Sequence, residues 1–105
     1  MVSLEISLRA QRDLNNILRY SARMWGPEQA ETYVDGLRTV FQRLESFPEL
    51  GQALGRRRIR RLVHQKHVLF YRFDSDQVTV LRVVSIRAAL PLGLEAGRTT
   101  DEGAS

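Results

Sequence analysis

The chain has 105 residues, of which 43% are hydrophobic and 27% charged, so it has room for one small domain and is too apolar to be disordered throughout. The absence of cysteine excludes disulfides, thiolate metal sites and cysteine nucleophiles. Because the chain also has no apolar run long enough to span a membrane and no sign of a secretory signal, we expect a cytoplasmic protein. The net charge of +4 is concentrated in residues 56–87, where eight Arg and Lys66 face only two acids for a net +7, and such a basic segment favours an anionic partner.

The first half of the chain predicts a short strand followed by two helices. Apolar and polar side chains alternate over residues 2–6, as in a half-buried strand. Ser7 can cap a helix, and Gly26 followed by Pro27 ends that helix and begins another, because glycine favours helix ends and proline the first helical turn. Apolar residues recur at helical spacing in both, which predicts an antiparallel hairpin ending at Phe47. We expect its core side to contain Leu14, Ile17, Leu37, Phe41 and Leu44.

The second half changes to the period of strands. Strands are predicted over residues 58–63, 67–73 and 78–86, and the last is apolar on both faces, which indicates a central position in the sheet. Consecutive strands with short turns pair antiparallel. The predicted order is therefore β-α-α-β-β-β, an α+β fold whose N-terminal helical hairpin packs on one face of a small antiparallel sheet. We expect a single domain over residues 1–90 and a flexible tail over residues 91–105.

The residues themselves indicate no metal or cofactor. His64 and His67 lie three positions apart on extended backbone, so alternation is expected to place them on opposite faces, where they cannot share an ion. A metal-free ribonuclease is compatible with the composition, because either histidine can titrate near neutral pH while the basic segment holds phosphate. We expect Tyr71 to be packed, with its hydroxyl at the rim of the core.

Several stretches of the chain, taken in their order and spacing, resemble a known family. They are residues 10–20, 25–51, 68–72 and 80–87. Together they are similar to the RelE/ParE superfamily of toxins from bacterial type II toxin–antitoxin modules. The ParE-like branch is the nearest, because the chain has a Trp-Gly pair between the predicted helices, a Pro-x-x-Gly after the second helix, and a Phe-Tyr-Arg strand.

The resemblance implies a compact toxin that inhibits DNA gyrase and that a cognate acidic antitoxin neutralises. It also implies that the toxin reaches operator DNA only indirectly, through the antitoxin, and that it has no membrane partner and no cofactor. RelE-like members instead cleave mRNA on the ribosome, and an inactive homologue would only bind its antitoxin. Departures from the family favour gyrase inhibition without catalysis. Ser85 stands where the family often has a His two positions before Arg87, and Val68 stands where the nucleases carry an Arg. An arginine is a poor general base, so the residues that are left bind phosphate better than they catalyse, and no catalytic residue is assigned.

Basic residues are the candidates for partner binding. Arg87 matches the family position most often tied to activity, and with it we assign target binding to Arg61 and His67. The dense cluster of Arg58, Arg60 and Arg61 is assigned to the antitoxin. Arg82 is expected to be structural and to pair with Asp13 or Glu49, because its neighbours on its face of the strand are apolar.

Overall fold

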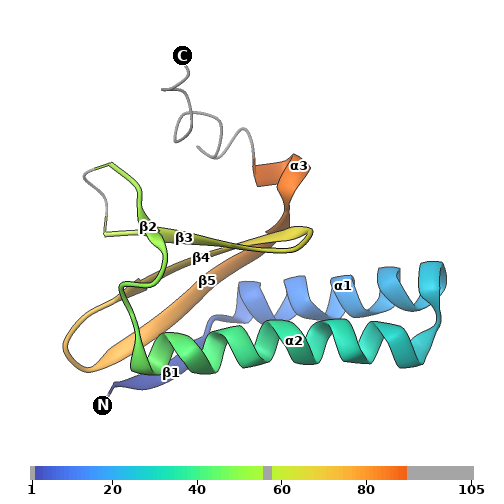
Figure 1. Cartoon of the computed structure of the whole chain (residues 1–105), viewed down its shortest axis with the longest axis horizontal. Coiled ribbons are helices and arrows are strands. Elements are labelled where there is room, and N and C mark those ends of the chain that lie inside the picture. Colours follow the sequence, from blue (N-terminus) through green and yellow to red (C-terminus); the bar gives the residue numbers. More distant parts are fainter. Residues whose placement is uncertain (1, 56–57, 90–105) are drawn as a thin grey trace.

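The computed structural model describes residues 2–55 and 58–89. Figure 1 shows two long helices side by side along one face of a twisted sheet, which confirms the predicted α+β class. The elements follow the order β1 (Ser3–Ile6), α1 (Leu8–Trp25), α2 (Pro27–Ser46), β2 (Gln52–Ala53), β3 (Arg60–His64), β4 (His67–Phe73), β5 (Gln77–Ser85) and α3 (Ile86–Ala89). The predicted tail over residues 91–105 lies outside the described residues, so the domain boundary stays a prediction.

The helical hairpin begins and turns where its capping residues predict. The Ser7 hydroxyl accepts a hydrogen bond from the Ala10 N–H at 3.0 Å and so caps α1. Gly26 ends α1 with φ at 94°, a conformation that glycine adopts without strain, and its N–H donates to the Ala22 carbonyl. Pro27 then occupies the first turn of α2. The two helices therefore reverse direction over a single residue.

The sheet is mixed, whereas the sequence predicted an antiparallel one. Its strand order is β1-β5-β4-β3-β2, and β1 runs parallel to β5 while the other pairs are antiparallel. A strand joined to its partner by a long connection is not restricted to antiparallel pairing, and nearly the whole described chain separates β1 from β5. The last strand was expected to be central, but β4 holds the middle place, and β5 is an internal strand between β1 and β4.

The core lies between the helical hairpin and the sheet. Four of the five predicted core residues are buried there, and Ile17 is half-buried against them. From the sheet, Leu69 and Tyr71 of β4 and Val83 of β5 join this core. A smaller cluster lies on the opposite face of the sheet, where Ala89 of α3 packs against Val68 and Phe70.

A bulge in β5 changes which side chains share a face. Phe70 is opposite Arg82, but the next residue, Tyr71, is opposite Val80, so Leu81 is extra. Val80 and Val83 consequently both face the helical hairpin. Strict alternation along the strand predicts Val80 and Val83 on opposite faces, and this prediction is wrong because of the inserted residue. Strict alternation does not survive an inserted residue.

Side chains of α1 and of its N-cap Ser7 complete the hydrogen bonding of β5 where β1 ends. The Ser7 hydroxyl donates to the Leu81 carbonyl at 3.0 Å, and the Asp13 carboxylate accepts from the Val83 N–H at 2.9 Å. Arg82 donates to the same carboxylate, with Nε 2.8 Å from Oδ2 and Nη2 3.2 Å from Oδ1. This bonding raises the pKa of Arg82, so the guanidinium stays charged. Of the two partners predicted for Arg82, Asp13 and Glu49, the structure shows Asp13.

Replacing Arg82 by alanine is expected to destabilise the domain by about 1–3 kcal/mol, between the small value of an exposed ion pair and the larger value of a buried one. The intermediate estimate follows from exposure, because 34% of the Arg82 side chain and 12% of the Asp13 side chain are accessible. Urea unfolding measures the loss. Arg72→Ala removes an exposed arginine of β4 and is the matched control, expected within about 0.5 kcal/mol of wild type. Equal midpoints for the two variants would contradict a structural role for Arg82.

Candidate functional site

The structure does not bring the three residues assigned to target binding into one site. His67 faces the helical hairpin, where its ring contacts Tyr33 of α2. Arg61 is paired across the strands with Phe70, which belongs to the cluster on the opposite face. Arg87 is exposed and lies in α3, because β5 ends at Ser85 and the chain then makes a helical turn. The Ser85 hydroxyl accepts from the Ala88 N–H and caps that turn.

The arginines assigned to the antitoxin differ in accessibility. Arg58 is exposed, Arg60 is half-buried, and Arg61 is only 6% exposed and donates to the Gln52 side-chain oxygen at 2.8 Å. Arg60 and Arg61 are neighbours on β3 and so lie on opposite faces of the sheet. Arg58 and Arg60 are therefore the more accessible of the three, and their role in antitoxin binding stays a prediction.

The two histidines lie on one face, and the expectation that they lie on opposite faces is wrong. They are opposite each other at the end of the β3–β4 hairpin, closed by a turn of Gln65 and Lys66 in which Gln65 has a φ of 53°. Residues that flank a two-residue turn are cross-strand partners, so their side chains point the same way. Both rings lie near the Tyr33 ring, with centroids 6.2 Å away for His64 and 5.4 Å away for His67.

The Tyr33 hydroxyl and His67 Nδ1 are 2.6 Å apart. Burial lowers the pKa of His67, and the nearby His64 and Lys66 lower it further, so His67 is neutral at pH 7. Burial raises the pKa of Tyr33, so its hydroxyl stays protonated at pH 7, and the hydroxyl and Nδ1 are joined by a hydrogen bond. In residues 2–55 and 58–89, no group of three or more metal-ligating side chains is brought together, so these two histidines have no third ligand there.

Aromatic side chains form an exposed cluster at the tip of the helical hairpin, which the sequence did not single out. The Lys66 ammonium lies 4.2 Å from the centroid of the Trp25 ring, a cation–π distance. Tyr20 meets Trp25 edge to face, with centroids 6.3 Å apart. The turn between β3 and β4 therefore rests on the turn between α1 and α2.

Tyr71 fastens the loop after α2 to the sheet. The expectation of a hydroxyl at the rim is wrong, because Tyr71 is fully buried. Its oxygen accepts from the Gly51 N–H at 2.7 Å and donates to the Pro48 carbonyl at 2.7 Å. Burial raises the pKa of this hydroxyl. Arg60 adds a bond of 2.7 Å to the Gly51 carbonyl and a longer one of 3.3 Å to the Glu49 carbonyl.

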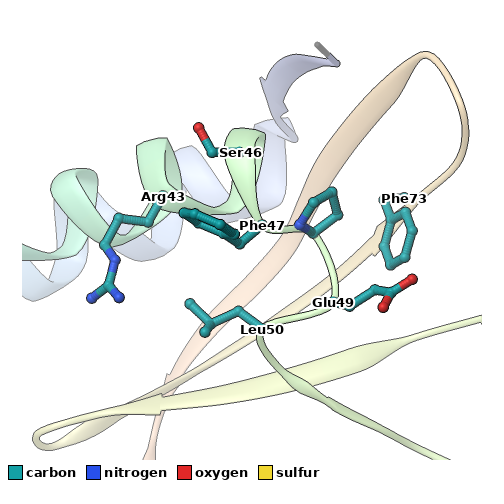
Figure 2. A pocket seen from close by; sticks show the side chains of 7 residues that line it. Arg43, Ser46, Phe47, Glu49, Leu50 and Phe73 are labelled. Carbon is teal, nitrogen blue, oxygen red and sulfur yellow. The ribbon is translucent and has the colours of Figure 1, made fainter.

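An open groove of about 600 Å³ lies beside this loop. Its lining comes from the end of α2, from the loop and from the end of β4, and comprises Arg43, Ser46, Phe47, Pro48, Glu49, Leu50 and Phe73. Figure 2 shows Phe47 and Leu50 together near Arg43, with Glu49 beside Phe73. The Arg60 guanidinium lies 5.5 Å from the centroid of the Phe73 ring. The groove is thus apolar in its walls and is flanked by two arginines.

None of the helices in the described part of the chain has the length and apolar character needed to cross a membrane.

Comparison with known proteins agrees with this fold. A family model described as "ParE toxin of type II toxin-antitoxin system, parDE" matches residues 4–89. Toxin ParE1 of Caulobacter vibrioides is 35% identical over 97 residues, which cover 89% of this chain and 100% of that protein. A solved chain of the "Chromosomal ParDE TA system from P. aeruginosa" superposes with a TM-score of 0.74 at 21% identity, covering 82% of this chain and 97% of the other. This chain therefore belongs to the ParE family of toxins of type II toxin–antitoxin systems.

Proposed function

We propose that this ParE-family toxin inhibits DNA gyrase without catalysis of its own and that a cognate acidic antitoxin neutralises it. The observation that carries the proposal is the separation of acid–base groups from the arginines assigned to the target. The only two histidines of the chain face the helical hairpin, whereas Arg61 and Arg87 belong to the other side of the sheet and to α3. Metal-free RNA cleavage needs a base, an acid and a phosphate-binding cation around one phosphodiester. Such an assembly is not formed by these residues.

A second candidate function is metal-independent RNA cleavage of the RelE type, and one observation favours it. The hydrogen bond between Tyr33 and His67 fixes the ring of His67, and burial keeps this histidine neutral at pH 7, which is the state a general base requires. His64 lies opposite it as a potential acid. We rank this function second because the adjacent cation, Lys66, contacts the Trp25 ring.

Induced expression in bacteria separates the two functions. Gyrase inhibition is expected to raise the SOS response and cause filamentation while bulk mRNA stays intact, because a poisoned gyrase leaves broken DNA. With purified components, the toxin is expected to block gyrase supercoiling and trap cleaved DNA. Rapid mRNA decay without an SOS response would instead support RNA cleavage, and the variant His67→Ala would then be expected to abolish it.

Arg87→Ala is expected to leave the fold and antitoxin association intact while growth inhibition is lost. Arg87 is exposed, so its removal costs little stability, whereas loss of one charged contact to an anionic target costs about 1.5–3 kcal/mol of binding. The measurement is colony formation after induction, with melting temperature as the check on folding. Arg38→Ala removes an exposed arginine of α2 and is expected to stay toxic. Full toxicity of Arg87→Ala would show that this residue does not contact the target.

The antitoxin is proposed to be acidic because residues 56–87 carry a net +7. It would reach operator DNA and carry the toxin with it. Co-purification of the toxin with the product of the adjoining gene tests the partnership, and the pair is expected to stay associated at about 0.15 M salt, where charge attraction is only partly screened. Failure to associate would remove the basis for neutralisation.

A further inference from the structure

We propose that the groove at the C-terminal end of α2 binds an apolar side chain of the antitoxin, with Arg43 and Arg60 pairing with acidic residues beside it. The inference rests on the proposed neutralisation by an acidic antitoxin and adds the place of contact. The groove extends the antitoxin contact beyond the cluster of Arg58, Arg60 and Arg61 to the end of α2, and Arg60, which stands over Phe73, links the two.

The groove is lined by large apolar side chains that are exposed and not buried in the core. Phe47 is 62% exposed and Leu50 is 42% exposed. Both line the groove together with Phe73, which itself packs against the main core. Isolated exposed apolar residues are ordinary on protein surfaces, but two that share one groove form a surface that a partner can cover.

The loop after α2 cannot turn Phe47 and Leu50 toward the core, because hydrogen bonds to the sheet hold its backbone in place. Buried Tyr71 holds both the Pro48 carbonyl and the Gly51 N–H, and the Leu50 N–H donates to the Phe47 carbonyl at 3.1 Å. Arg60 also binds the Gly51 carbonyl. A surface fixed in this way loses little conformational freedom when a partner binds, which favours affinity. The same bonds that expose Phe47 and Leu50 therefore make them a preformed docking surface.

Charge indicates which partner fits. Arg43 is exposed in the last turn of α2 and lines the groove, and Arg60 sits over the Phe73 ring. Among the described residues that line the groove, Glu49 is the single acid. A second copy of this chain carries a net charge of +4 and would be repelled, whereas an acidic segment would be attracted. An antitoxin segment with an apolar side chain between carboxylates would fit, because the apolar group matches the walls of the groove and the carboxylates match Arg43 and Arg60 at its rim.

The test measures binding of the purified antitoxin from the adjoining gene to Phe47→Ala, with Tyr20→Ala as the matched control. Tyr20 is an aromatic residue of similar exposure, 53%, near the far end of the helical hairpin. Phe47→Ala is expected to weaken binding at least about tenfold, as for a central apolar contact, and Tyr20→Ala less than about threefold. Arg43→Glu is expected to weaken binding more at low salt than at high salt, while Arg23→Glu, in the last turn of α1, is not.

The outcomes separate this inference from the proposed function. Tight binding by wild type with equal affinity for Phe47→Ala would overturn the inference and leave neutralisation standing. No binding by wild type would overturn both. Size-exclusion chromatography of the toxin alone provides a further check, because a dimer that Phe47→Ala dissolves would show that a second copy occupies the groove and would also overturn the inference. Unchanged melting temperatures of the variants ensure that affinity, not folding, is compared.

Discussion

Replacing Gly51 by alanine is expected to destabilise the domain by roughly 3 kcal/mol or more, which is a large part of the margin of a small domain. A Cβ on Gly51 would lie 2.5 Å from the Arg61 carbonyl oxygen and 2.7 Å from the Tyr71 hydroxyl oxygen. The first of these atoms is backbone of β3 and the second belongs to a buried ring, so neither can move away cheaply. The substitution would also break the Gly51 N–H bond to Tyr71. Urea unfolding of the purified variant measures the effect.

Gly36→Ala is the matched control for this substitution. Its Cβ would lie 3.6 Å from His64 Nε2, an ordinary contact, and the residue is in the middle of α2. Alanine is the better helix former by about 0.5–1 kcal/mol, so this variant is expected to equal or exceed wild type in stability. Similar stabilities of the two alanine variants would show that the loop after α2 adjusts freely, contrary to the bonds that hold it.

Leu37→Ala is expected to lower the free energy of unfolding by about 2–5 kcal/mol. Growth inhibition is expected to be lost as a consequence. Leu37 is fully buried in α2, and alanine would leave a cavity between the helices and the sheet. Because the residue has no exposed surface, toxicity should fall in proportion to the folded protein and for no other reason. Thermal unfolding and growth assays, run on the same variant, test the two together.

Thr39→Ala is the control for Leu37→Ala. Thr39 is exposed on α2 and its hydroxyl only bonds back to the Asp35 carbonyl, so the change is expected within about 0.5 kcal/mol of wild type. A Leu37→Ala protein that melts at the wild-type temperature and yet fails to inhibit growth would assign Leu37 to a binding surface instead of the core.

The helices could be predicted because their signals are local. Ser7 and Gly26 set the ends of α1 through bonds to residues within the same helix, and the apolar period sets its buried face. The partner of β1 could not be predicted, since a four-residue strand carries no mark of the strand it joins. The bulge at Leu81 could not be predicted either, because leucine is an ordinary strand residue and nothing in the sequence marks it as inserted.

The candidate sites were less predictable than the fold. Counting positions along one strand separated His64 from His67, because the turn between them reverses the chain and restores a common face. Charge density identified Arg58 and Arg60 but carried no information on the burial of Arg61. The groove was missed altogether, since it combines the end of α2, the loop after it and Phe73 from a strand that follows much later in the sequence.

The parallel pairing of β1 with β5 delays completion of the fold during synthesis. Ser3 pairs with Gln77, more than 70 residues later, so the first strand made waits for the last. The helical hairpin can form early from its own local contacts, but Val78, Val80 and Val83, which cover its apolar face, arrive only with β5. A nascent chain released before this strand is made would expose that face and lack the Val83 N–H that Asp13 binds. The core therefore closes only once β5 has been made, after an interval in which the apolar side of the hairpin stays open to any protein that binds unfolded chains.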